Sequence, residues 1–142
     1  MTAPSELPRL SAVEQARLIR TRQVSPSELL HAHLAVIARV NPQLNAIVTL
    51  VEDQARETAK SIEQRLARGE ALGPLAGLPV VIKDVTLTRG IRTTYGSPHY
   101  RDFIPDEDAE VVARLRRADA IILAKTNTPE FAAGANTVNE VF

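Results

Sequence analysis

The 142-residue sequence contains no cysteine and no tryptophan, and only five aromatic residues in all. The absence of cysteine excludes disulfides, cysteine-ligated zinc, iron–sulfur clusters and thiol catalysis. Positive and negative side chains balance to a formal net charge of zero. This balance argues against a nucleic-acid-binding face and against a polybasic membrane patch, because both need an excess of cationic side chains.

Long hydrophobic runs are also missing. One of the longest, at residues 120–124, is far too short to cross a bilayer. Residues 1–6 show no basic segment followed by an apolar stretch, which a secretory signal requires. We therefore expect a soluble, cytoplasmic protein that does not bind membranes.

The first half of the chain is predicted to be mostly helical. Residues 25–28, Ser-Pro-Ser-Glu, combine a capping hydroxyl, a proline at the first helical position and a carboxylate at the third. They predict a helix that begins at Pro26 and ends at the Asn41-Pro42 pair. Further helices are expected at about 11–22 and 51–68, with a short strand or extended segment at 44–50.

The second half alternates strands with helices. Residues 78–82 and 121–123 are continuous apolar runs rich in β-branched residues, a pattern typical of strands covered on both faces. We expect both to be interior strands of one sheet, with a helix from about Glu107 between them. This alternation indicates an α/β fold with a mostly parallel or mixed sheet covered by helices. No linker or repeat divides the chain, so residues 1–142 are interpreted as one domain or one piece of a larger one.

The common catalytic and cofactor motifs are absent. The sequence has no zinc-binding helix motif, no phosphate-binding P-loop and no dinucleotide fingerprint. His31 and His33 lie two positions apart on a predicted helix, so they point to different faces and do not form a metal-binding pair. We expect neither a metal nor a cofactor.

Lysine is scarce, with three residues against fourteen arginines. Lys83 directly follows the predicted strand at 78–82, at the place where open α/β sheets hold their sites. Burial there would favour the neutral amine, which can act as a general base. The alternative is a structural lysine that reaches the surface and pairs with Asp84. Lys125 follows the run at 121–124, and the same two interpretations, a general base or a structural lysine, apply to it.

Four ordered blocks carry a family resemblance. They read GLPVVIKD at 77–84, GIRTTYGS at 90–97, DAEVVARL at 108–115 and KTNTPEF at 125–131. This succession resembles the amidase signature family, and the resemblance extends over nearly the whole chain from about residue 10. It implies that residues 1–142 are the N-terminal part of a single, incomplete amidase-signature domain.

The resemblance also implies a chemistry. Enzymes of this family hydrolyse carboxamides through a serine–cis-serine–lysine triad, and Lys83 matches the triad lysine. The two serines belong to a serine- and glycine-rich loop, and none of the six serines of this sequence has such surroundings. We therefore expect the chain by itself to be inactive.

A substrate pocket is implied beside residues 126–134. The residues expected to line it are Phe131, Ala132, Ala133 and Gly134. The alternative interpretation of this segment is a capped helix that packs Phe131 into the core.

Two other functions remain open. One is a non-catalytic remnant or interaction module that keeps only the front of the fold. The other is a part similar to the tRNA-amidating subunit of a tRNA-dependent amidotransferase. The Thr-Pro-Glu-Phe sequence at 128–131 resembles general amidases more than the Met-Asp-Glu-Phe typical of that subunit. The expected partner is a small-molecule amide, with no nucleic acid, and an open sheet edge allows self-association.

Overall fold

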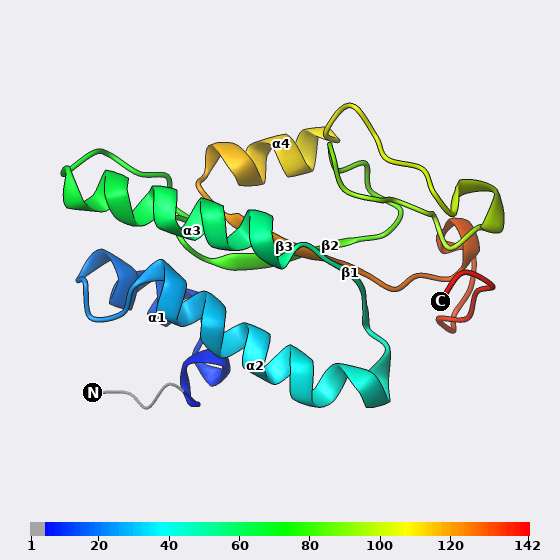
Figure 1. Cartoon of the computed structure of the whole chain (residues 1–142), viewed down its shortest axis with the longest axis horizontal. Helices are drawn as coiled ribbons and strands as arrows, with labels where there is room; N and C mark the ends of the chain where they lie inside the picture. The colour runs from blue at the N-terminus through cyan, green and yellow to red at the C-terminus, as the bar shows by residue number, and fades with distance from the viewer. Residues whose placement is uncertain (1–4) are drawn as a thin grey trace.

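A computed structural model describes residues 5–142 of the chain (Figure 1). The elements follow one another as η1 (Leu7–Arg9), α1 (Ala12–Arg20), α2 (Pro26–Leu44), β1 (Ile47–Leu50), α3 (Glu52–Ala67), β2 (Pro79–Lys83), η2 (Pro98–Tyr100), α4 (Glu110–Arg117), β3 (Ile121–Thr126) and η3 (Glu130–Ala132), where η marks a 3-10 turn. Residues 1–4, part of the start on which the absence of a secretory signal was argued, lie outside the described residues. Within residues 5–142, no helix has both the length and the apolar character needed to cross a membrane.

The start of α2 confirms the predicted capping box. The Ser25 hydroxyl accepts a hydrogen bond from the Glu28 amide at 3.1 Å, and the Glu28 carboxylate accepts one from the Ser25 amide at 2.8 Å. The end of α2 differs from the prediction, because the helix continues through Pro42 to Leu44. Proline in the last turn removes one backbone hydrogen bond without ending the helix, which stops where Asn45 adopts a left-handed φ of 49°.

The sheet has three strands in the order β1-β3-β2. β3 is central, pairing parallel with β2 and antiparallel with β1, so the sheet is mixed. The expectation that residues 78–82 form an interior strand is wrong for the described chain. β2 lies at an edge of the sheet, and Val81 is 45% exposed. An uninterrupted apolar run shows that both faces of a strand suit burial, but the run does not supply the residues that would cover them.

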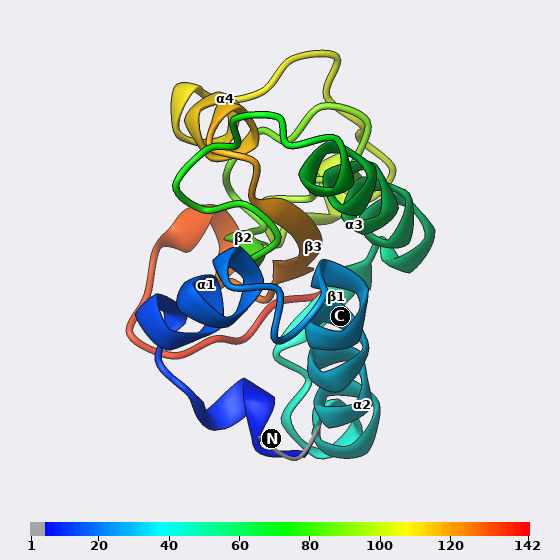
Figure 2. The ribbon, with the colours of Figure 1, turned by 90° about the vertical axis from the view of Figure 1, so that its left-hand side faces the viewer.

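Helices lie on both sides of this sheet. Figures 1 and 2 show helices above and below the strands, and the apolar contacts place α2 and α3 together on one face of β3 and α4 on the other. The central strand contributes to two apolar clusters. One combines Ile121, Leu123 and Ala124 with Leu30, Leu34, Ala55, Ala59 and Ile62. The other combines Ile122 with Ile82, Ile91 and Val112. The fold is therefore mixed α/β, as expected, with its core centred on β3.

We expect Leu123→Ala to lower the free energy of unfolding by about 3 kcal/mol, because it removes a buried side chain and leaves a cavity. Leu123 is 1% exposed and belongs to the larger apolar cluster. The matched control is Val13→Ala on α1, where the side chain is 77% exposed and the expected change is below about 0.5 kcal/mol. Urea unfolding followed by circular dichroism measures both, and equal effects would contradict a core centred on β3.

Candidate functional site

Lys83 is the last residue of β2 and lies opposite Thr126 of β3. Its carbonyl oxygen accepts a hydrogen bond from the Thr86 amide at 2.9 Å, so residues 83–86 form a turn directly after the strand. The predicted position at a strand end is confirmed. The Lys83 side chain, however, is exposed, and it makes no hydrogen bond or ion pair with any residue of the described range 5–142.

Asp84 points into the protein and does not pair with Lys83. The carboxylate is fully buried and accepts two hydrogen bonds from Thr94, at 3.0 Å from the amide and 2.5 Å from the hydroxyl. The Asp84 amide donates to the Thr126 carbonyl, and the Asp84 carbonyl accepts from the Tyr95 amide. The alternative of a Lys83–Asp84 pair is therefore wrong, since this carboxylate holds the loop that follows β2.

The lysine that is buried is Lys125, in the central strand. Its Nζ donates to the Thr86 carbonyl at 2.8 Å and to the Thr93 hydroxyl at 2.5 Å, and it lies 3.7 Å from Asp84 Oδ1. Burial lowers the pKa of Lys125 to about 8, although the nearby Asp84 carboxylate opposes this shift. With its ammonium surrounded by acceptors and no exposed surface, Lys125 has no access to a substrate and is structural.

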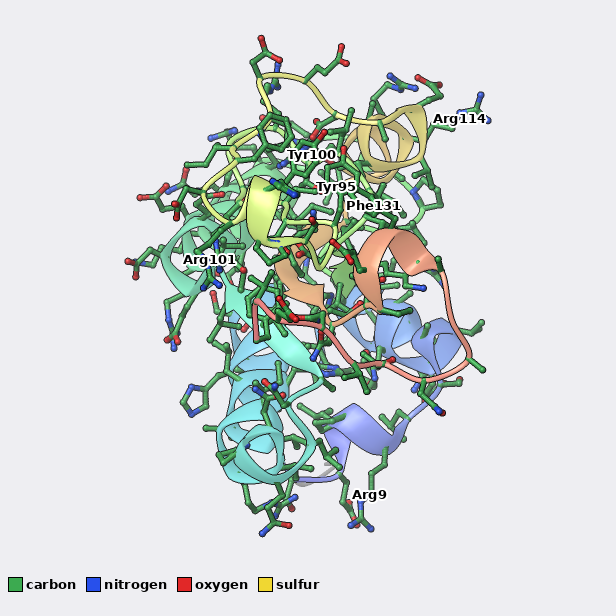
Figure 3. The ribbon with its side chains drawn as sticks, turned by 90° about the vertical axis from the view of Figure 1, so that its right-hand side faces the viewer. Arg9, Tyr95, Tyr100, Arg101, Arg114 and Phe131 are labelled. Atoms are coloured by element: carbon green, nitrogen blue, oxygen red, sulfur yellow. The ribbon has the colours of Figure 1, made fainter. Side chains whose placement is uncertain are left out.

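Four of the five aromatic residues gather beside this region, and we call them the aromatic cluster. They are Tyr95, Tyr100, Phe103 and Phe131, with ring centroids 5.1 to 6.4 Å apart in the contacting pairs. Figure 3 shows Tyr95, Tyr100 and Phe131 close together on one side of the molecule. Burial raises the pKa of the Tyr95 hydroxyl, with smaller contributions from Tyr100 and Asp84.

The backbone connects the aromatic cluster to the turn at 83–86. The Phe131 amide donates to the Tyr95 carbonyl at 2.7 Å, and the Tyr95 amide donates in turn to the Asp84 carbonyl at 2.9 Å. Two successive hydrogen bonds therefore separate Phe131 from the residue that follows Lys83. The segment expected to lie beside a substrate pocket is therefore linked through its backbone to the turn that carries Lys83.

Phe131 is 54% exposed, so the alternative in which it packs into the core is wrong. Ala132, Ala133 and Gly134 are exposed as well. Tyr95, Phe131 and Ala132 have positive φ values of 55°, 51° and 58°, in the left-handed region that residues with a Cβ rarely adopt. Such strained conformations persist only where surrounding contacts enforce them, and they concentrate at functional sites.

Sequence reasoning missed the buried group of Lys125, Asp84, Thr93 and Thr94. A signal was present, because Lys125 directly follows the apolar run at 121–124, of which residues 121–123 were predicted to be a buried strand. A lysine there needs acceptors from elsewhere in the chain. Among residues 5–142, no three or more histidine, aspartate or glutamate side chains are grouped so that they could hold a metal ion.

Comparison with known proteins places these observations in a family. The family model named Amidase matches residues 28–142. A glutamyl-tRNA(Gln) amidotransferase subunit of Acidothermus cellulolyticus is 47% identical over 138 residues, which cover 97% of this chain and 27% of the relative.

Two solved structures agree with this match. A bacterial aryl acylamidase of the amidase signature family has a TM-score of 0.81 at 31% identity, covering 86% of this chain and 26% of its own. A 6-aminohexanoate cyclic dimer hydrolase has a TM-score of 0.82 at 31% identity, covering 99% and 27%. The chain thus spans about a quarter of the length of the proteins it matches.

The lowered pKa of Lys125 predicts a stability that rises with pH. The pKa of Lys125 is about 8 in the folded chain and 10.5 for an ordinary lysine. Between these two pH values the unfolded chain therefore binds more protons than the folded chain. The free energy of unfolding should therefore increase by about 3 kcal/mol across this window relative to a Lys125→Met variant. Urea unfolding of both proteins at several pH values measures the difference, in which the other titrating groups cancel. Parallel pH profiles would contradict the burial of a charged Lys125.

Proposed function

The chain belongs to the amidase family, and from this premise we propose that it supplies the catalytic lysine, Lys83, of an amide-hydrolysing site. The observation that carries the proposal is the position of this side chain, which extends from the end of β2 and is exposed. The other two lysines are poorer candidates. Lys125 is enclosed by its acceptors, and Lys60 lies in the middle of the surface helix α3.

The proposed reaction moves one proton through Lys83. The reaction requires Lys83 to act as a free amine, which accepts a proton from a bridging serine while that serine takes the proton of a nucleophilic serine. The nucleophile's oxygen bonds to the amide carbon, the C–N bond breaks, and the departing amine receives the proton back along the same path. Water then attacks the acyl-enzyme ester, and its proton passes along the same path to the serine oxygen as the ester bond breaks and the acid is released. Both serines belong to a segment that residues 1–142 do not contain, and an exposed Lys83 is accessible to it.

The proposed substrate is a small-molecule amide whose apolar part contacts Phe131. The Phe131 ring is largely exposed, yet Tyr95 and Tyr100 hold it at centroid distances of 6.1 Å. Ala132, Ala133 and Gly134, which follow, are exposed and have little side-chain volume. An exposed aromatic ring on a strained backbone, connected to the Lys83 turn, supports a role in substrate binding.

A second candidate function is that of a subunit in a glutamyl-tRNA amidotransferase. The observation in its favour is the 47% identity to the Acidothermus cellulolyticus protein of that name. In this function Lys83 keeps its proposed role in releasing ammonia from an amide donor. The ammonia then attacks the side-chain carboxyl group of a glutamyl-tRNA(Gln) that has been activated beforehand, and the activating group leaves. The Thr-Pro-Glu-Phe sequence at 128–131 favours the first candidate.

The test of Lys83 needs a complete catalytic domain. We suggest a chimera in which residues 1–142 replace the matching segment of the Acidothermus cellulolyticus amidotransferase chain. Lys83→Ala should lower kcat/KM for amide hydrolysis by at least about 100-fold, since it removes the general base. Lys83→Arg should do nearly as badly, because arginine keeps its proton at neutral pH.

The matched control is Lys60→Ala, which removes an exposed lysine from α3 and should leave kcat/KM unchanged. Near-normal turnover in Lys83→Arg would show an electrostatic role and overturn the assignment of Lys83 as a base. Full activity in Lys83→Ala would favour the non-catalytic interpretation of this segment. Amidation of glutamyl-tRNA(Gln) without hydrolysis of simple amides would favour the second candidate.

Phe131→Ala in the same chimera should raise KM for aromatic amides by about 10-fold or more, because it removes most of a large apolar contact surface. The kcat should change little, since Phe131 does not take part in proton transfer. Val138→Ala is the control, as it shortens another exposed side chain of the C-terminal segment, 75% exposed. If KM is unchanged by Phe131→Ala but raised by Val138→Ala, the substrate does not contact Phe131 and the proposed binding role of this residue is wrong.

A further inference from the structure

The turn that carries Lys83 is held from β3 by a single side chain. Lys83 is the first residue of this turn, because its carbonyl accepts from the Thr86 amide. Lys125 Nζ contacts the turn at two other positions, donating to the Thr86 carbonyl at 2.8 Å and lying 3.7 Å from Asp84 Oδ1. Lys125 Nζ also donates to the Thr93 hydroxyl at 2.5 Å, which connects the turn to the loop that follows it.

These contacts all lie on the buried side of the turn. Successive residues of a strand point to opposite faces. Ile82 and Asp84 are buried accordingly, and Lys83 between them is exposed. In the β2–β3 register Lys125 lies opposite Ile82, one position before the pairing of Lys83 with Thr126. The Lys125 side chain therefore holds the segment that directly follows Lys83 and does not compete for the amine of Lys83.

From this arrangement we infer that Lys125 is a positioning residue for Lys83. Its buried ammonium joins Thr86, Thr93 and Asp84, and so fixes the turn from which the Lys83 side chain extends. The functional part of this inference rests on the proposed function of Lys83. A misplacement of a catalytic group by about 1 Å can cost 100-fold in rate, so the geometry of this turn matters for the reaction.

A lysine at position 125 serves the turn and the loop at the same time. Its ammonium donates two hydrogen bonds, to Thr86 and Thr93, and its charge lies 3.7 Å from Asp84 Oδ1, which makes no hydrogen bond. An apolar side chain of similar volume would fill the space but leave the buried Asp84 carboxylate without the nearby positive charge. It would also remove one of the two hydrogen bonds to the Thr86 carbonyl, which accepts from the Thr88 hydroxyl as well. Replacing Lys125 by an apolar residue is therefore expected to loosen the turn first and not the whole core.

The first experiment measures amide hydrogen exchange in the 142-residue chain. Three amides report on the turn: those of Asp84, Thr86 and Tyr95, which donate to Thr126, Lys83 and Asp84. In Lys125→Met these amides should exchange at least about tenfold faster relative to the amides of α2 and α3. The matched control, Lys60→Met on the exposed side of α3, should change none of them.

A second variant covers the case in which Lys125→Met does not fold. Thr93→Val removes one of the acceptors of Lys125 while it keeps the shape of the side chain and leaves the ammonium in place. It should speed exchange at the same three amides, by a smaller factor. Unchanged exchange at Asp84 and Thr86 in a folded variant would overturn the inference, as would an increase spread evenly over the whole chain.

The second experiment uses the chimera and separates kcat from KM. Lys125→Met should lower kcat by at least about tenfold and leave KM within about twofold, because Lys125 is buried away from the substrate. Lys60→Met should leave both unchanged. If Lys83→Ala retains full activity, the proposed function fails, whereas the exchange experiment still decides whether Lys125 holds the turn. If Lys83 is required and Lys125→Met keeps its kcat, the positioning role is wrong.

Discussion

The ammonium of Lys125, buried in the central strand, is the constraint on which the end of the sheet depends. A charge without access to water needs acceptors close by, and here they come from a turn and from a loop that returns over β3. The same requirement places the Asp84 carboxylate inside the protein, where Thr94 satisfies its other oxygen. Lys83 is exposed as a consequence, because it alternates with two buried neighbours.

Much of the fold follows from local sequence. The Ser-Pro-Ser-Glu segment at 25–28 specifies the start of α2 through hydrogen bonds between residues three apart, and such contacts can be predicted from spacing. The apolar run at 121–123 likewise identifies a strand that is buried on both faces. The open side of β2 could not be predicted, because a strand's neighbours depend on the packing of distant segments and not on its own residues.

The candidate site was predicted less completely, for a related reason. The position of Lys83 at a strand end follows from the run before it, whereas spacing does not reveal the partners of Asp84, which are Thr94 in the following loop and Lys125 on β3. The role of Lys83 in catalysis stays a prediction. The conformation of Phe131 was not foreseen, since aromatic residues avoid the left-handed region, and only its contacts with Tyr95 and Tyr100 explain why it is tolerated.

The order of the strands along the chain also bears on how the protein assembles. β3 is the only strand with two hydrogen-bonded neighbours in the described sheet, and it comes last in the sequence, at residues 121–126. During synthesis from the N-terminus, β1 and β2 emerge before either has a strand to pair with, whereas the hydrogen bonds of α1, α2 and α3 are local and can form early. The apolar residues of α2 and α3 that pack on β3 therefore stay uncovered until the central strand leaves the ribosome.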